Sequence, residues 1–242
     1  MLEKTISRRG FVMAAGACSL AVLTGVPTQA AHAVSGSTIT FTAEGNNCQA
    51  YASCGPKSSG SGAFGSVTVL CGSRPDPRTI SAGVDLFRYD AYVSGSRVYN
   101  PGWVTSFMAQ TSNSASGTYY AAGDVWGNTS GGFYVPATPS QYYRMPIPSL
   151  AVTEYELNEN GLEYGSLLSK KSVGHIPDLI KAVATNEEQG YIYKADWLAL
   201  GSNDFEAMVD AAQDPGYRYI PVYDIDGTTV LGEFAMYFGV GS

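Results

Sequence analysis

The stretch Ser66-Val67-Thr68-Val69-Leu70-Cys71 is the clearest β-strand pattern in the chain. Its β-branched valines and threonine are stiff side chains that fit a pleated strand. Short runs of similar character recur on both sides of it, separated by segments rich in glycine, serine, proline and asparagine. They lie at 39–42, 84–93, 106–109, 118–122, 123–126 and 132–135. This spacing predicts a mainly β protein in which residues 34–135 form an antiparallel β-sandwich or barrel.

Three cysteines lie near this strand, at Cys48, Cys54 and Cys71. If residues 55–65 form a hairpin loop, Cys48 and Cys71 face each other across it, and we favour this pair slightly over Cys54–Cys71. Either disulfide would restrict the unfolded chain and stabilise the fold by about 3 kcal/mol. The fourth cysteine of the chain, Cys18, lies in the N-terminal segment. If that segment is cleaved off, three cysteines remain, and one thiol is free or paired between molecules.

Residues 150–242 mix strand and helix patterns. Proline at 177 and aspartate at 178 suit the first turn of a helix over 177–184, and Asn203 with Glu206 resembles a capping box that starts a second helix over 203–212. Strands are predicted around two turns, Asn158–Gly161 and Asp226-Gly227, and at 190–195. The Asn-Gly pair favours a type I′ turn, and Asp-Gly is the strongest hairpin signal in the chain. The order β-β-α-β-α-β-β predicts a small α+β module.

Four prolines between 136 and 149 separate the two halves. Proline-rich segments favour an extended backbone, so this segment is the predicted linker. The predicted organisation is therefore an N-terminal segment at 1–33, a β-rich domain at 34–135, a linker at 136–149 and an acidic module at 150–242.

The N-terminal segment contains Ser7-Arg8-Arg9-Gly10-Phe11-Val12, which resembles a twin-arginine export signal. An apolar stretch follows from Phe11 to Val26, shorter than the roughly 20 residues that span a bilayer, and Ala31-His32-Ala33 offers a cleavage pattern. The resemblance implies that the twin-arginine translocation machinery is a partner during export and that cleavage follows Ala33. We expect a secreted mature protein with no stable membrane anchor. A retained N-terminal anchor is the alternative.

A second resemblance covers roughly residues 150–235. Its motifs are Asn158-Glu159-Asn160-Gly161 with Tyr164-Gly165-Ser166, Pro177-Asp178-Leu179-Ile180 with Ala182-Val183-Ala184-Thr185-Asn186, Gly190-Tyr191-Ile192, and Ile220–Asp224 continued by Asp226-Gly227, Thr229-Val230 and Gly232-Glu233-Phe234. Together they resemble the C-terminal module of uncharacterised secreted proteins of Gram-positive bacteria. The resemblance implies a secreted module and carries no functional residues with it.

Charge is placed unevenly. Residues 151–242 contain fifteen acids and five bases, and the whole chain has a net charge of −7. Such an acidic surface repels phosphates, which argues against nucleic acid as a partner. The charge is best explained as a solvated, solubilising surface.

Candidate catalytic and metal-binding residues are few. His175 is the single histidine after Ala33, so a multi-histidine metal site is excluded. Asp224 and Asp226 before Gly227 match the opening of a calcium loop, but a hairpin turn explains them better. Two carboxylates could support glycoside hydrolysis, yet no pair can be selected. We predict no catalytic residue, cofactor or metal.

Aromatic residues are concentrated in and just after the β-rich half. They are Tyr89, Tyr92, Tyr99, Trp103, Tyr119, Tyr120, Trp126, Tyr134, Tyr142 and Tyr143. Aromatic rings favour strands and pack in cores, but an exposed group of them would stack on sugars or peptides. We therefore expect an exported, non-catalytic protein that binds a cell-surface protein or glycan. The alternative is a secreted hydrolase that acts on cell-wall glycan or peptide through carboxylates.

Overall fold

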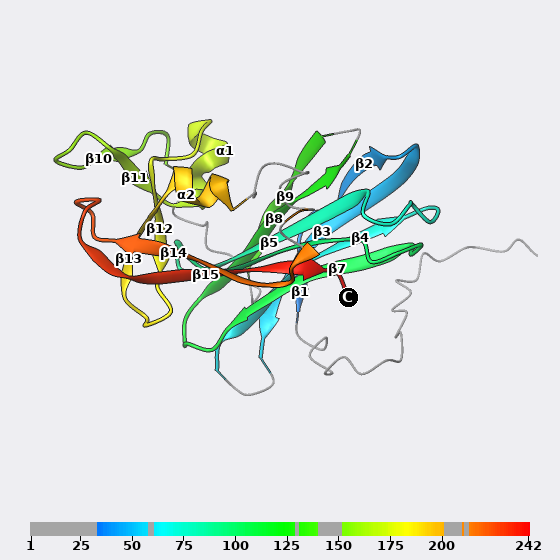
Figure 1. The fold of residues 1–242 in the computed structure, drawn as a ribbon, viewed down its shortest axis with the longest axis horizontal. Helices are drawn as coiled ribbons and strands as arrows, with labels where there is room; N and C mark the ends of the chain where they lie inside the picture. The colour runs from blue at the N-terminus through cyan, green and yellow to red at the C-terminus, as the bar shows by residue number, and fades with distance from the viewer. Residues whose placement is uncertain (1–32, 58–60, 129–130, 140–151, 201–209, 211–212) are drawn as a thin grey trace, which may run out of the picture.

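The computed structural model describes residues 33–57, 61–128, 131–139, 152–200, 210 and 213–242, and it builds them mainly from β-strands (Figure 1). The strands form two sheets, one of five strands and one of ten. The prediction of a mainly β fold is confirmed.

The first sheet contains the strand that opened the sequence analysis. Its strands are β1 (Val34–Ser35), β2 (Ile39–Ala43), β3 (Asn46–Pro56), β4 (Ala63–Cys71) and β7 (Ser106–Asn113). The order is β1-β3-β4-β7, with β2 also paired to β3, and every pairing is antiparallel. Strand β3 was predicted only through the hairpin loop at 55–65, because polar residues interrupt its own pattern.

Four strands of the second sheet pack against the first sheet. They are β5 (Ile80–Arg88), β6 (Ala91–Tyr99), β8 (Tyr119–Gly127) and β9 (Gly131–Pro139), in the order β6-β5-β8-β9. The alternate residues Val67 and Val69 of β4 are fully buried in one cluster with Val84 and Leu86 of β5. The described strands from β1 to β9 therefore form an antiparallel sandwich, one of the two architectures that the sequence predicted.

The C-terminal strands continue this sheet and close a small barrel. They are β12 (Leu179–Val183), β13 (Gln189–Tyr193), β14 (Gly216–Tyr223) and β15 (Val230–Val240). Consecutive strands pair in an antiparallel manner, and β6 joins the two ends of the series in parallel. Tyr92 of β6 lies opposite Ala182 of β12, and residues 95–99 lie opposite 236–240 of β15.

The buried side chains of Ile180, Ile192, Val222 and Phe234 belong to a second core cluster that includes residues of all five barrel strands. Strands β10 (Glu156–Leu157) and β11 (Glu163–Gly165) extend the sheet beyond β12. The helical segments are short: η3 (Leu167–Ser169), α1 (Lys170–Val173) and α2 (Lys194–Ala199).

The two halves of the chain share one sheet through β6, so residues of both lie side by side. Residues 136–139, predicted as the start of the linker, belong to strand β9. Residues 140–149, the rest of that linker, lie outside the described residues.

The helix predicted at 177–184 is wrong, because Leu179–Val183 is strand β12. Its pattern of four buried residues around the half-buried Lys181 fits a strand inside a sheet that is covered on both faces. Asp178, expected in a first helical turn, instead accepts a hydrogen bond from the backbone N–H of Glu163. The second predicted helix, 203–212, lies almost entirely outside the described residues.

The two glycine turns also differ from the type I′ prediction. A type I′ turn needs φ > 0 at both central residues. Here Gly161 (φ 76°) and Gly227 (φ 73°) adopt the left-handed conformation, whereas Asn160 and Asp226 do not have a positive φ. The Asn158 side chain instead accepts hydrogen bonds from the N–H groups of Asn160 and Leu162, which holds a longer loop.

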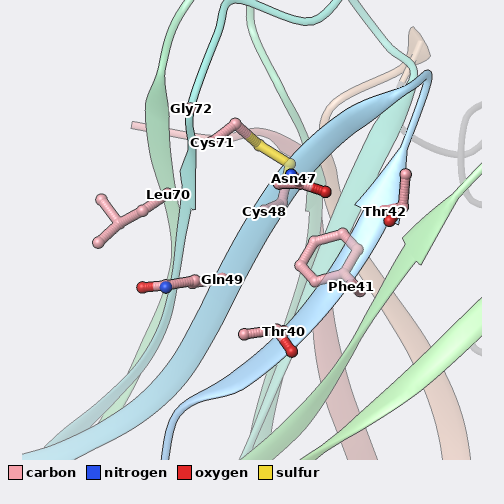
Figure 2. Close-up of a pocket in the computed structure, with 9 residues that line it drawn as sticks. All are labelled: Thr40, Phe41, Thr42, Asn47, Cys48, Gln49, Leu70, Cys71 and Gly72. Carbon is pink, nitrogen blue, oxygen red and sulfur yellow. A yellow bond between two sulfur atoms is a disulfide. The ribbon is translucent and has the colours of Figure 1, made fainter.

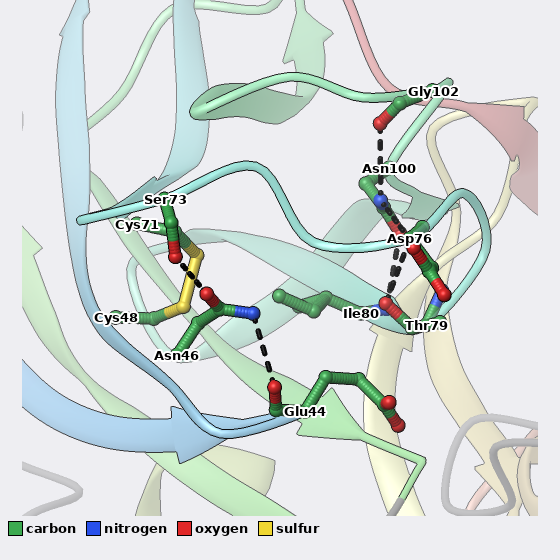
Figure 3. Close-up of a disulfide and its surroundings, with 10 residues drawn as sticks. All are labelled: Glu44, Asn46, Cys48, Cys71, Ser73, Asp76, Thr79, Ile80, Asn100 and Gly102. Carbon is green, nitrogen blue, oxygen red and sulfur yellow. Dashed lines mark hydrogen bonds between the residues drawn. A yellow bond between two sulfur atoms is a disulfide. The ribbon is translucent and has the colours of Figure 1, made fainter.

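A disulfide joins β3 and β4, between Cys48 and Cys71 (Figure 2). The two residues are direct partners in the antiparallel register, with Cα atoms 4.1 Å apart. This is the pairing that the sequence favoured. Beside it, the Ser73 hydroxyl donates to the Asn46 side chain, which ties the chain after β4 to the start of β3 (Figure 3).

Asn100 fixes the chain between β6 and β7 at one end of the sandwich (Figure 3). Its side-chain oxygen accepts hydrogen bonds from the N–H groups of Thr79 and Ile80, both at 3.0 Å. Its side-chain nitrogen donates to the carbonyl oxygen of Asp76 at 2.7 Å. The amide is fully buried, so these bonds replace the water it loses on folding.

A buried ion pair links β6 to β5. The guanidinium of Arg97 lies 2.7 Å from the carboxylate of Asp85, and the same carboxylate accepts a hydrogen bond from the Tyr92 hydroxyl. Gly83 makes room for it, since a Cβ there would lie 2.7 Å from the Arg97 side chain. Burial alone would lower the pKa of Arg97, but the carboxylates of Asp85 and Asp124 raise it, so the guanidinium stays charged.

We predict that Asp85→Asn lowers the free energy of unfolding by about 3 kcal/mol, because it leaves a buried guanidinium without its nearest carboxylate. Glu187→Gln is the matched control. It removes the carboxylate partner of Arg88, in an ion pair whose Glu187 side chain is 55 % exposed, and should cost less than about 1 kcal/mol. Urea unfolding at pH 7, followed by tryptophan fluorescence, measures both. Equal losses in the two variants would contradict this role for the buried pair.

Candidate functional site

Six tyrosines line the outward side of the C-terminal strands. We call this surface the tyrosine face; its members are Tyr191 and Tyr193 of β13, Tyr217, Tyr219 and Tyr223 of β14, and Tyr237 of β15. Successive side chains of a strand point to opposite faces. The intervening residues Ile192, Ile220 and Val222 are therefore buried in the barrel, while the tyrosines remain outside.

The rings of the tyrosine face contact each other along the sheet. Tyr193 and Tyr223 have centroids 5.2 Å apart, and Tyr217 and Tyr237 lie at 5.5 Å, both in edge-to-face arrangements. Tyr217 and Tyr219 are 58 % and 57 % exposed. Edge-to-face contacts hold the rings in fixed orientations, and their exposed faces are available for stacking.

An acidic pocket of about 280 Å³ adjoins one end of the tyrosine face. The ammonium of Lys181 binds both oxygens of the Asp90 carboxylate at 2.9 Å, and the Tyr164 hydroxyl donates to Glu156. The hydrogen bond to Glu156 raises the pKa of Tyr164. Burial, followed by the nearby carboxylates, raises the pKa of Tyr191. Both phenols therefore keep their protons at neutral pH and act as hydrogen-bond donors.

A second cavity, of about 340 Å³, adjoins the other end, where β7 meets the β14–β15 hairpin. We call it the edge groove; it is lined by Ser94, Gln110, Thr111, Ser112, Tyr217 and Tyr237. The hydroxyl groups of Ser94 and Thr111 are hydrogen-bonded to each other. All six side chains are uncharged at neutral pH, so the groove suits a neutral ligand with polar groups.

A third concavity, of about 520 Å³, surrounds the disulfide on strands β2, β3 and β4. Gln49 and Leu70 are register partners and point to the same side of the sheet (Figure 2). Apart from the disulfide itself, the lining is threonine, asparagine, glutamine, phenylalanine, leucine and glycine. Without a titratable side chain in its lining, this concavity offers no general acid or base.

His175 lies on the surface, where its ring is within hydrogen-bond distance of Glu163. Its Nε2 lies 2.6 Å from the Glu163 carboxylate, and its side chain is 51 % exposed. Tyr155 packs edge-on against its ring and donates a hydrogen bond to its backbone carbonyl. Burial, with a contribution from Glu163, raises the pKa of Tyr155 to about 12. These contacts account for His175 as a surface residue that fastens the segment after α1.

The carboxylate of Asp226 is occupied by its own turn. It accepts hydrogen bonds from the N–H groups of Thr228 and Thr229 and from the Thr229 hydroxyl, at 2.7–2.9 Å. These bonds hold the pKa of Asp226 well below its usual range. Asp224 accepts from the N–H of Ile225. The hairpin interpretation thus explains both acids, and within the described residues no group of three or more potential metal ligands is present.

The aromatic residues of the N-terminal half form no shared exposed surface in the described ranges. Tyr92, Tyr99, Tyr119 and Tyr120 are buried, whereas Tyr89 and Trp103 are exposed. Trp126 donates its indole N–H to Asp124, and Lys170 lies over the ring of Tyr134. Tyr142 and Tyr143 lie outside the described residues. Two further exposed tyrosines, Tyr217 and Tyr219, lie together on β14, where the alternation of Tyr217, Tyr219 and Tyr223 in a predicted strand was the available signal.

The export-signal residues Ser7, Arg8, Arg9, Phe11 and Val12 lie outside the described residues. Ala33 is described, and β1 starts at the next residue, where Val34 pairs with Cys54. Within the described part of the chain, no helix is both long and apolar enough to cross a bilayer.

Comparisons with protein-family models, with curated proteins and with solved structures find no match to this chain.

Cys54, the third cysteine, is buried inside the sandwich and is free. Its position excludes both the Cys54–Cys71 pairing and an accessible thiol for pairing between molecules. Burial raises the pKa of the Cys54 thiol to about 12, although a backbone hydrogen bond from Gly55 lowers it in part.

We predict that Cys54 in the folded protein reacts with an aromatic disulfide reagent at pH 8 about a thousandfold more slowly than in the denatured protein, because both access and the thiolate fraction are reduced. Since the folded pKa exceeds the unfolded value of 9.0, the neutral thiol stabilises the fold below pH 9, and this contribution is lost as the pH rises from 9 toward 12. Cys54→Ala should therefore show a smaller loss of stability over that range. Rapid native labelling would contradict the burial of the thiol.

Proposed function

We propose that this chain is an exported, non-catalytic protein that binds a cell-surface protein or glycan through its tyrosine face. The supporting observation is the row of tyrosines across β13, β14 and β15, two of which are more than half exposed. Tyrosine combines a large apolar ring with a hydroxyl donor and is enriched at binding surfaces. The open cavities at the two ends extend this surface, which suits an elongated ligand.

Hydrolysis through a pair of carboxylates has weaker support. Asp85 and Asp124 both approach Arg97, but the Asp85 side chain is only 3 % exposed and is held by Arg97 and Tyr92. In the acidic pocket, Asp90 is bound by Lys181 and Glu156 by Tyr164. A general acid or nucleophile needs access to substrate, and these neighbours already occupy the carboxylates.

Export by the twin-arginine route forms the second part of the proposal. The Ser7–Val12 motif carries it, together with the resemblance of residues 150–235 to secreted modules. A cysteine pair at disulfide distance is compatible with an extracellular protein. In this proposal the protein is released after cleavage behind Ala33.

We predict that the double variant Tyr217→Ser, Tyr219→Ser lowers the affinity for Gram-positive cell envelopes at least tenfold, because two stacking rings are lost. Tyr89→Ser is the matched control, since Tyr89 is also 57 % exposed but lies on the turn between β5 and β6 and is not part of the tyrosine face. Co-sedimentation of purified protein with isolated envelopes and with purified peptidoglycan measures the binding. An unchanged affinity in the double variant would rule out the tyrosine face as the binding surface.

We also predict that Arg8→Lys combined with Arg9→Lys reduces the amount of mature protein in the culture medium at least tenfold, because the receptor reads the arginine pair. Lys4→Arg, which preserves the motif and the charge, should leave export unchanged. Immunoblots of cell and medium fractions provide the measurement. Normal export of the double-lysine variant would disprove the twin-arginine route.

A further inference from the structure

Strand β7 forms an edge of the five-stranded sheet. It pairs with β4 on one side. On its other side, within the described residues, the end of the chain pairs with Met108: the Met108 N–H donates to the Ser242 carbonyl at 3.0 Å, and the Ser242 N–H donates back at 3.3 Å. An extended backbone thus already lies along part of this edge, where the end of β15 reaches β7 (Figure 1).

The same edge continues past Met108 into the edge groove. In a strand, the backbone groups of alternate residues point to the same side. The N–H and C=O groups of Gln110 and Ser112 therefore point in the direction of those of Met108, away from β4. Both residues line the edge groove, and the backbone hydrogen bonds of the described residues include no partner for them on that side.

The sheet opposite β7 is wider than the sheet that covers it. Strand β7 lies over β6, as the hydrogen bond between Ser94 and Thr111 shows. Strands β15 and β14 extend beyond β6. Tyr217 and Tyr219 of β14 face the same side and are more than half exposed, whereas Tyr237 of β15 is partly buried against the sandwich core. One more strand beside β7 would cover these rings as β7 covers β6.

We propose that an extended, uncharged segment of a partner polypeptide adds as a strand to the edge of β7 in the edge groove. Its backbone exchanges hydrogen bonds with Gln110 and Ser112, and its inward side chains pack on Tyr217 and Tyr237. This inference rests on the proposed function, because it assigns a ligand class to one end of the tyrosine face.

A polypeptide fits this site better than a glycan does. Strand addition uses the regular N–H and C=O groups of a main chain, spaced as in a sheet. The pairing of Ser242 with Met108 shows that the edge accepts such a backbone. The groove lining is uncharged, and the acidic C-terminal half repels acidic segments, so the partner segment is neutral at its contact residues.

The test uses a nonapeptide selected from a random display library on the purified mature protein. Ser112→Pro removes one edge N–H from a strand edge that tolerates proline, and it should weaken peptide binding at least tenfold. Tyr89→Ser, on the turn between β5 and β6 and outside the edge groove, should leave peptide binding within twofold. On the peptide side, N-methylation of alternate residues in one register should abolish binding, and in the other register should not. Thermal melting verifies that both variants are folded.

Hydrogen exchange on the unaltered protein provides a second measurement that no variant can disturb. Peptide binding should slow exchange at the amides of Gln110 and Ser112. Strand addition would be overturned if the selected peptides bound the Ser112→Pro variant as tightly as the unaltered protein. A library that yields no binder, or amide exchange that peptide binding leaves unchanged, would overturn it as well. If the protein forms a dimer and Ser112→Pro abolishes that dimer, a second copy of the chain occupies the edge, and the proposal of a partner peptide is overturned.

The same variants separate this inference from the proposed function. Envelope binding that survives Ser112→Pro but is lost with Tyr217→Ser, Tyr219→Ser keeps the tyrosine face as a binding surface and overturns the peptide strand as its ligand. If envelope binding is unchanged in both Ser112→Pro and the double tyrosine variant, the tyrosine face is not the binding surface and the proposed function is wrong.

Discussion

The fold depends on strand β6 belonging to two structures at once. One edge of β6 pairs with β5 in the sandwich, and the other pairs with β12 near its start and β15 near its end. A slip of one residue would exchange the two faces of the strand and place the Arg97 guanidinium in the apolar sandwich core. The buried pair of Arg97 and Asp85 therefore fixes the register on which both the sandwich and the barrel are built.

Local patterns predicted the elements whose partners are near in sequence. The β3–β4 hairpin and its disulfide, and the β14–β15 hairpin around Gly227, are of this kind. The failure at 177–184 arises at the far edge of the strand. Leu179–Val183 pairs along one edge with the nearby antiparallel strand β13, but its other edge contacts β11 and β6 in parallel, and parallel partners leave no turn signal between them. Proline and aspartate before this segment suit a helix start, but burial on both sides favours a strand.

The location of the exposed aromatics depends on the same long-range pairing. Tyr92 is buried because its ring packs against Phe234 of β15, at a centroid distance of 4.6 Å, and against Phe87. The C-terminal half thus covers aromatic side chains of the N-terminal half, while its own tyrosines lie on the outer surface. Alternation along β14 showed that Tyr217, Tyr219 and Tyr223 share a face. Sequence could not show that this face is outside, because that depends on which strands cover it.

The edge of β7 lacks the features that usually protect a sheet edge. Natural proteins protect such edges with proline, charged side chains or a covering segment. Strand β9, at the end of the other sheet, contains Pro136, whereas residues 106–113 contain neither a proline nor a charge. The end of the chain covers β7 at Met108 but leaves Gln110 and Ser112 facing a cavity. An unprotected edge above exposed tyrosines would favour aggregation in a protein that stayed unbound. Occupation by a specific peptide strand resolves that liability and places the edge and the rings in one binding site.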